Sequence, residues 1–214
     1  VRGGKGADRI SSIAAVSQST VNGDLGADTL IFAAATDQAS IYGGSATSTT
    51  DDGADSLFFS GGATQTNIQA NAGADTLILN VASAQTTVKG GADGDSISIV
   101  VGGSDLTVYG NKGNDTLNFA ASTDATYDAG EGSNFISGAG ALTSSSVFGG
   151  DSSDTLFLEA NTGKYYAKGG ADSLALTITS GTVFGGSSAG DTAAGNDTLN
   201  ILSMVAGRVD LGAG

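Results

Sequence analysis

A residue with an acidic or amide side chain recurs along almost the whole chain, mostly 20 residues apart. Two residues after each of these positions stands an aliphatic side chain, and two residues before it stands a glycine in eight of the ten copies. The aligned positions are Asp8, Asp28, Asp55, Asp75, Asp95, Asp115, Asn134, Asp154, Asp172 and Asp197. A repeat this regular predicts a solenoid, because one copy cannot bury its apolar face without the copies on either side.

Each repeat contains two segments with the pattern of a strand. After the aligned position the residues alternate, as in 115–119 (DTLNF), which places Leu and Phe on one face and Thr and Asn on the other. A second, shorter segment such as 106–109 (LTVY) leads directly into a glycine-rich turn. Helices are not expected, because glycine is too frequent and no helical stripe is present. The sequence therefore predicts an all-β, parallel solenoid of about ten coils of roughly 20 residues, stacked ~4.8 Å apart.

The repeat pattern covers residues 1–214 as a single array. Two seven-residue insertions interrupt it, one within 45–52 and one within 187–194. The chain begins and ends within a repeat, so we expect it to be a fragment of a longer repeat region, or a chain whose array is continued by assembly.

Composition excludes several classes of function. The net charge of −14 argues against nucleic acid and anionic membrane surfaces as partners, because both attract clusters of Lys and Arg. The apolar runs are too short to predict membrane insertion. The sequence has no His, no Cys and no nucleophile motif, so we predict that it is not an enzyme. Cations are the partners that this charge favours.

The carboxylates are concentrated where the coils turn. Of the 22 acidic residues, 16 lie in or beside the glycine-rich turns. In stacked coils, unpaired carboxylates would repel one another by roughly 1 kcal/mol per neighbour even in water. Burial in so thin a core offsets little of the entropy of ordering the chain. Divalent cations between the turns would convert the repulsion into cohesion.

These turns also carry a resemblance to a known family. Residues 3–8 (GGKGAD) and 110–115 (GNKGND) resemble G-G-x-G-x-D-x-U-x, the nonapeptide repeat of the RTX, or haemolysin-type, calcium-binding proteins. Residues 23–28 (GDLGAD) and 70–75 (ANAGAD) fit it with small changes. The resemblance covers nearly the whole chain and implies a right-handed parallel β-roll with calcium between successive turns. Calcium takes six to eight oxygen ligands, and glycine lets backbone carbonyls turn inward.

The resemblance implies that side-chain oxygens and glycine carbonyls of the turns hold calcium. In the family both turns of a coil carry the motif, whereas here only one does, so we expect one Gly/Asp-rich calcium edge and one plain edge. The turns with Asn134, with Ser152 and Ser153, or with Lys168 are expected to be weak or empty sites. The implied calcium-site residues are Gly3, Gly6, Asp8, Gly23, Asp24, Gly26, Asp28, Asp52, Asp55, Asn71, Gly73, Asp75, Gly90, Asp93, Asp95, Gly110, Asn111, Gly113, Asp115, Asn134, Gly149, Asp151, Asp154, Gly170, Asp172, Asp191 and Asp197.

The sequence is similar in style to RTX-like bacterial surface proteins, those of the oscillin and S-layer type included. This similarity implies a calcium-binding structural protein of an extracellular, self-assembling layer, sheath or filament at the cell surface. Calcium would then drive both folding and homopolymer assembly. The alternative is a folding and secretion module of a secreted enzyme or adhesin whose functional domain lies outside this chain.

Two other interpretations use the same residues. Asx and Gly are common in turns, so a metal-free solenoid is possible without any calcium site. A row of outward hydroxyl side chains could bind ice or a cell-surface glycan, although Ser and Thr also suit outward strand positions for structural reasons alone. The row consists of Thr29, Ser56, Thr76, Ser96, Thr116, Thr155, Ser173 and Thr198.

Overall fold

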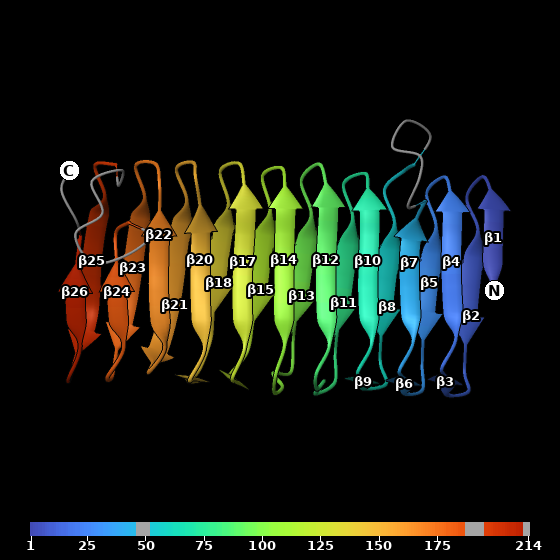
Figure 1. Ribbon diagram of the computed structural model, residues 1–214, viewed down its shortest axis with the longest axis horizontal. Coiled ribbons are helices and arrows are strands. Elements are labelled where there is room, and N and C mark those ends of the chain that lie inside the picture. The colour runs from blue at the N-terminus through green and yellow to red at the C-terminus, as the bar shows by residue number, and fades with distance from the viewer. Residues whose placement is uncertain (46–51, 187–194, 212–214) are drawn as a thin grey trace.

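The computed structural model describes residues 1–45, 52–186 and 195–211. Over these residues the chain winds into a rod of parallel strands, in which two long sheets face each other and the two termini lie at opposite ends (Figure 1). The predicted all-β parallel solenoid with coils of about 20 residues is confirmed. Residues 46–51 and 187–194, where the two predicted insertions fall, lie outside the described residues.

The two long sheets, here called sheet A and sheet B, have eleven and ten strands, and every strand is paired with its equivalent in the next coil. Sheet A consists of β1 (Arg2–Lys5), β4 (Thr20–Leu25), β7 (Ser40–Gly44), β10 (Asn67–Ala72), β12 (Thr87–Ala92), β14 (Thr107–Lys112), β17 (Thr126–Glu131), β20 (Ser146–Gly150), β22 (Lys164–Lys168), β24 (Thr182–Phe184) and β26 (Arg208–Asp210). Sheet B consists of β2 (Arg9–Ser12), β5 (Thr29–Phe32), β8 (Ser56–Phe59), β11 (Thr76–Leu79), β13 (Ser96–Ile99), β15 (Thr116–Phe119), β18 (Phe135–Gly138), β21 (Thr155–Asn161), β23 (Ser173–Ile178) and β25 (Thr198–Met204).

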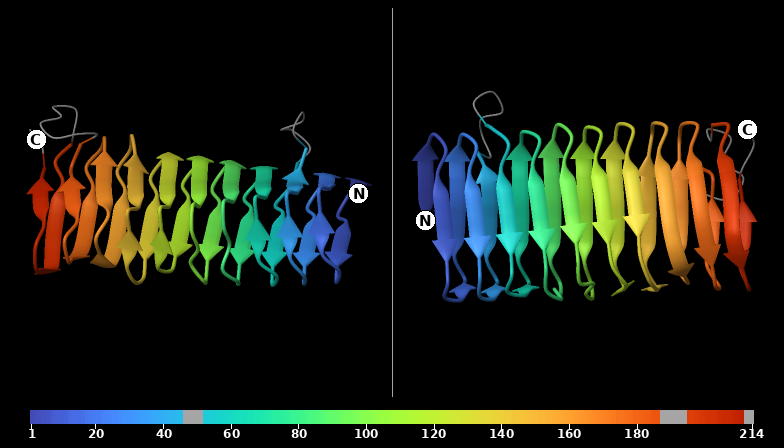
Figure 2. Two further views of the ribbon diagram at one scale, coloured as in Figure 1. Left: turned by 60° about the horizontal axis from the view of Figure 1, so that its bottom comes forward. Right: turned by 180° about the vertical axis from the view of Figure 1, so that it is seen from behind.

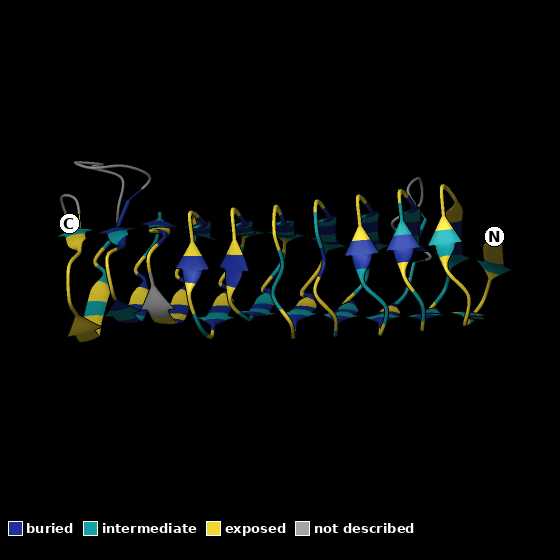
Figure 3. Ribbon diagram, turned by 90° about the horizontal axis from the view of Figure 1, so that it is seen from below, coloured by how far each residue is buried: buried dark blue, intermediate teal, exposed yellow. Residues whose placement is uncertain are grey.

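The pairing register sets equivalent residues of successive repeats beside one another. In sheet B, Leu77 pairs with Leu57 on one side and Ile97 on the other. In sheet A, Val88 pairs with Ile68. All of these side chains point inward and are buried, so the repeat produces apolar columns that form one core along the rod. Figure 3 shows buried and exposed residues alternating along the strands.

One coil compensates for an unusually large core residue. Tyr127 stands where most coils have Val or Ile, and its ring stacks on that of Phe119 with centroids 3.8 Å apart. Gly138 follows Phe119 in the sheet B register, and a β-carbon there would overlap the Phe119 ring. The buried Tyr127 hydroxyl is satisfied by Ser122 Oγ at 2.8 Å. The large and small residues therefore balance across adjacent coils.

The edge opposite the glycine-rich turns, predicted to be plain, carries a third parallel ladder of very short strands (Figure 2). Its strands are β3 (Val16–Ser17), β6 (Thr36–Asp37) and β9 (Ala63–Thr64), with β16 (Ser122–Thr123) and β19 (Leu142–Thr143) further along. The residue after this ladder turns the corner in the left-handed conformation, as Gln38 does with φ of 50°. Its side-chain amide accepts a hydrogen bond from Gln18 and donates one to Gln65, at 2.9 Å each. The Gln65 amide in turn donates to Gln85 at 3.0 Å. Hydrogen bonds between exposed glutamine side chains, here called the glutamine ladder, therefore link the first coils along this edge.

Among the described residues, no helix is long and apolar enough to cross a membrane.

Candidate metal centre

The ten aligned aspartate and asparagine residues form one column along the edge of the glycine-rich turns. Each lies one residue before a strand of sheet B, where the turn re-enters the rod. In the middle of the rod these polar side chains are buried: Asp55, Asp75 and Asp115 are each 1% exposed. We call this set, from Asp8 to Asp197, the inner column.

Asp75 shows how one residue of the inner column uses its polar groups. Its N–H donates to Asp95 Oδ1 at 2.9 Å, and its own Oδ1 accepts from the Asp55 N–H at 2.7 Å. Its carbonyl accepts from the Ser96 N–H at 2.8 Å. Its Oδ2 is buried and has no partner. A buried, ionised oxygen without a partner is strongly destabilising, so this position requires a proton or a cation.

The same arrangement repeats along the inner column. Each N–H donates to the next Oδ1 at 2.7–3.1 Å, from Asp8 to Asp197. The residues whose Oδ2 is buried without a partner are Asp8, Asp28, Asp55, Asp75, Asp95, Asp115, Asp154, Asp172 and Asp197. Stacked coils lie ~4.8 Å apart. The structure thus places unsatisfied carboxylate oxygens in one row that runs along the rod.

Asn134 is the one inner-column residue without a carboxylate. Its Oδ1 keeps the ladder bond by accepting from the Asp115 N–H at 2.8 Å. Its Nδ2 donates to the Gly132 carbonyl at 2.9 Å, so both ends of the amide are satisfied. Asn134 therefore interrupts the charge of the column without interrupting its hydrogen bonds.

A glycine at the start of the turn makes room for each carboxylate. A β-carbon on Gly3 would lie 2.8 Å from Asp8 Oδ2, and one on Gly110 would overlap Asp115 Oδ2. The pairs of this kind are Gly3 with Asp8, Gly23 with Asp28, Gly43 with Asp55, Gly90 with Asp95, Gly110 with Asp115, Gly149 with Asp154, and Gly185 with Asp197. Ala70 takes the equivalent place before Asp75, so a methyl group is accommodated in that coil.

A second glycine, two residues before the inner-column residue, allows the coils to approach. Gly113 has φ of 122°, and a β-carbon there would overlap the Asp93 carbonyl of the preceding coil. Gly26, Gly73 and Gly170 are in the same situation. Gly6, in the first coil, has a positive φ but nothing within reach of a β-carbon. The glycines predicted as site residues therefore shape the turn around the inner column.

Burial raises the pKa of the inner-column carboxyls. Desolvation is the largest cause, repulsion by neighbouring carboxylates adds to the increase at Asp75 and Asp95, and the ladder N–H opposes it. The pKa rises to about 9 at Asp75, about 8 at Asp95, about 7 at Asp55 and about 6 at Asp115. Near neutral pH, the centre of the column is therefore poised to hold either protons or a cation.

The residues present fit calcium. In the described ranges, no group of three or more acidic, His or Cys side chains converges, so a cation at the column would combine carboxylates with backbone oxygens. Calcium accepts that mixture, whereas most transition metals prefer nitrogen or sulfur ligands. The Oδ2 atoms of the inner column and carbonyls of the glycine-rich turns would hold it. When bound, calcium would supply the positive charge that the column lacks.

The remaining predicted side-chain ligands lie in the same turns but away from the inner column. Asp24 pairs with Arg2 at 3.6 Å, and Asn71 Nδ2 donates to the Gly44 carbonyl at 2.6 Å. The others at the outer surface are Asp93, Asn111 and Asp151. Their role as ligands stays a prediction.

Asp52 is different, because one of its carboxylate oxygens is itself buried beside the inner column. Its Oδ2 accepts from the Ser45 N–H at 3.0 Å, while its Oδ1 is buried without a partner. Burial raises its pKa, and its charge in turn raises the pKa of Asp55. Asp191 lies outside the described residues.

We expect the calcium-free protein to lose stability as pH rises. The folded state raises these pKa values from 3.8 to between about 6 and about 9, so the folded chain binds more protons than the unfolded chain in this range. Stability is then greatest below about pH 4 and falls as pH rises through the folded pKa values. Urea midpoints of dialysed protein across this range test the expectation. Midpoints that increase from acid to alkaline pH without calcium would contradict it.

The predicted row of outward hydroxyls exists on sheet B but is interrupted. Thr29, Ser56 and Thr76 are in register in successive coils. Phe135 occupies the same row between Thr116 and Thr155 and is 44% exposed. The row is therefore continuous from Thr29 to Thr116 and interrupted beyond Thr116.

No family model matches the sequence, and no curated protein matches it. Among solved structures, the fold resembles the X-ray crystal structure of a hyperactive, Ca²⁺-dependent, β-helical antifreeze protein from an Antarctic bacterium, with a TM-score of 0.59 and 18% sequence identity. The match covers 100% of this chain and 64% of that chain. At this identity the likeness concerns the fold, a β-helix.

Proposed function

We propose that this chain is a calcium-stabilised structural solenoid of an extracellular layer, sheath or filament at a bacterial cell surface. The observation that carries the proposal is the inner column, whose buried Oδ2 atoms lack partners in coil after coil. Calcium between these carboxylates would make binding free energy part of folding free energy, as in other proteins whose metal sites form only on folding. A protein that resembles this chain in fold is Ca²⁺-dependent, which supports the same choice of metal.

The structural part of the proposal rests on the shape of the molecule. A solenoid makes contacts mainly between neighbouring coils, so it grows in one dimension and presents the same edges along its length. Such a rod suits a repetitive layer or fibre. We further propose that calcium promotes association of copies of the chain, because the like charge of −14 opposes their approach in its absence.

Light scattering with and without calcium tests the assembly proposal. We expect the calcium-saturated protein to form larger species whose size grows with concentration, and chelation to reverse the growth. Magnesium is the matched control, because its strict octahedral preference suits this donor set poorly. A folded, calcium-saturated protein that stays monomeric at high concentration would overturn the layer or filament. It would leave the folding module of a secreted protein as the better account.

A further inference from the structure

A break in the repeat opens a groove on the outer face of sheet A. The second residue of each glycine-rich turn faces outward, and along the first coils it alternates between glycine and a side-chain amide or carboxylate. The row in register is Gly4, Asp24, Gly44, Asn71, Gly91, Asn111, Gly130, Gly150 and Lys168. Two glycines stand side by side in this row at Gly130 and Gly150. These two neighbouring coils therefore have no side chain at this position, and we call this part of the sheet the bare strip. Each earlier glycine in the row lies next to an Asp or Asn side chain.

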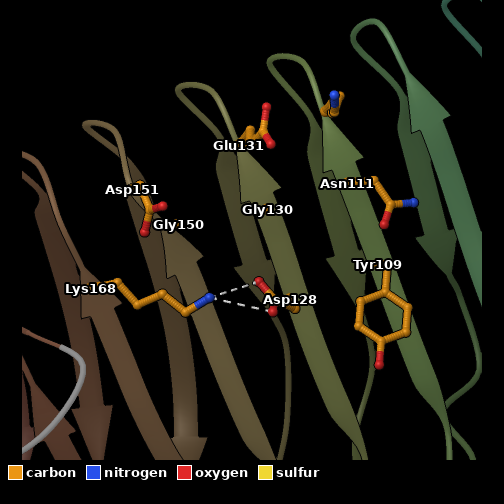
Figure 4. A pocket seen from close by; sticks show the side chains of 9 residues that line it. Tyr109, Asn111, Asp128, Gly130, Glu131, Gly150, Asp151 and Lys168 are labelled. Carbon is orange, nitrogen blue, oxygen red and sulfur yellow. Dashed lines mark hydrogen bonds and ion pairs between the residues drawn. The ribbon is translucent and has the colours of Figure 1, made fainter.

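The bare strip is enclosed by side chains on all sides. Tyr109 and Asn111 stand on β14 at one end, and Lys168 on β22 stands at the other (Figure 4). Because these ends are three strand spacings apart, they are separated by ~14 Å. Glu131 and Asp151 line the side nearest the turn. The groove has a volume of about 310 Å³, the lower end of the range for small-ligand sites.

Lys168 forms one wall of the groove in a strained conformation. Its φ is 73°, at a position that is Gly or Asn in the three preceding coils. Its side chain crosses β20, where the ammonium lies 5.1 Å from the centre of the Phe148 ring. It ends at Asp128, two coils away, with an Nζ–Oδ1 distance of 3.2 Å. A left-handed lysine costs about 1 kcal/mol or more, and strain of this kind is often found at functional sites.

We propose that this groove binds a neutral saccharide of one or two sugar rings. Sugar hydroxyls both donate and accept hydrogen bonds, and the rim offers both kinds of partner: carboxylate acceptors at Asp128 and Glu131, and donors at Asn111 and Lys168. The half-buried Tyr109 ring supplies the apolar surface against which the C–H face of a sugar packs. The glycine floor lets a flat ring approach the sheet.

The charge of the rim selects against other ligands. Three carboxylates, Asp128, Glu131 and Asp151, face the two ammonium groups of Lys112 and Lys168. An anion would therefore be repelled on balance. The carboxylates form no cluster able to hold a metal ion within the described part of the chain. A neutral, hydroxyl-rich ligand therefore matches this groove better than either ion. The groove faces outward, whereas the inner column faces the core, so the proposal does not depend on calcium at the inner column.

NMR titration of the calcium-saturated chain tests this proposal. The probes are maltose, cellobiose and N,N′-diacetylchitobiose as neutral saccharides, with digalacturonic acid as the acidic comparator. We expect at least one neutral disaccharide to bind with a dissociation constant on the order of 1 mM and to shift the amides of Gly130 and Gly150. Tyr109→Ala should weaken that binding by about tenfold or more.

Tyr42→Ala is the matched control, because Tyr42 occupies the same outward row three coils away from Tyr109. It should leave the affinity unchanged. Equal weakening by both substitutions would overturn the proposal, as would tighter binding of the acidic sugar. If Tyr109→Ala fails to fold, the chemical shifts of the wild-type protein test the proposal alone. Amide shifts of Gly130 and Gly150 that stay unchanged with each neutral saccharide on the order of 10 mM would rule the site out.

Discussion

We expect that removing calcium at about pH 9 abolishes most of the β-sheet circular dichroism of this protein. At that pH the inner column is largely ionised, since the highest pKa among its carboxyls is about 9. The chain then carries a row of buried carboxylate oxygens that repel one another, beside a core too thin to offset this repulsion. At calcium concentrations ~100 times the dissociation constant, each site adds ~2.7 kcal/mol, so four sites would add ~11 kcal/mol. That is comparable to the whole stability of an ordinary domain, about 5–15 kcal/mol.

The measurement is a far-ultraviolet spectrum before chelation, after chelation and after calcium is restored. We expect calcium to recover the strand signal and an equal concentration of magnesium to recover little of it. An unchanged β spectrum in excess chelator at this pH would contradict calcium-dependent folding. The metal-free solenoid would then be the better interpretation.

The effect of Asp75→Asn on the stability of the protein should change sign when calcium is added. Without calcium near neutral pH, the Asp75 carboxyl must take up a proton on folding, because its pKa rises to about 9 in the folded chain. An amide needs no proton and can satisfy both positions, as Asn134 does with Gly132. We expect stabilisation of about 1–3 kcal/mol, the usual cost of an unsatisfied buried group. With saturating calcium the same substitution removes a ligand and should destabilise the protein by ~2–3 kcal/mol. Paired urea melts of wild type and variant measure both values.

Asp105→Asn controls for the loss of a charge. Asp105 is exposed at the opposite edge and has φ of 51°, which asparagine tolerates. We expect a change within about 0.5 kcal/mol in either condition. If Asp75→Asn instead shifts stability in one direction regardless of calcium, the inner column does not bind the ion.

The inner column could be predicted because its signal is periodic. Asp28, Asp55 and Asp75 keep a fixed distance from the aliphatic residue at the second position of each sheet B strand, so the register follows from the sequence. The glutamine ladder has an equally regular signal. Gln18, Gln38, Gln65 and Gln85 each lie ten residues after an inner-column residue. The sequence predicts a plain edge here because these turns lack the Gly/Asp motif, and strands of two residues show no alternation that would predict a ladder.

The direction in which turn residues point could not be predicted. Asn111 and Asp115 stand in one motif, yet one faces the solvent and the other the core. The difference depends on the left-handed conformation of Asn111, with φ of 79°, which spacing does not reveal. The match between Phe119, Tyr127 and Gly138 was hidden for a related reason. The Phe119 and Tyr127 rings stack within one coil, but the space for the Phe119 ring comes from Gly138, which only the pairing register with the next coil sets beside it.

Anomalous diffraction from crystals grown with calcium tests the central claim most directly. We predict peaks 2.3–2.6 Å from Oδ2 atoms of the inner column, the usual calcium–oxygen distance. We also predict that the anomalous peaks are weaker beside Asn134, where the inner column carries no carboxylate. Density showing a folded inner column without anomalous peaks, at millimolar calcium and a pH above the carboxyl pKa values, would contradict the account.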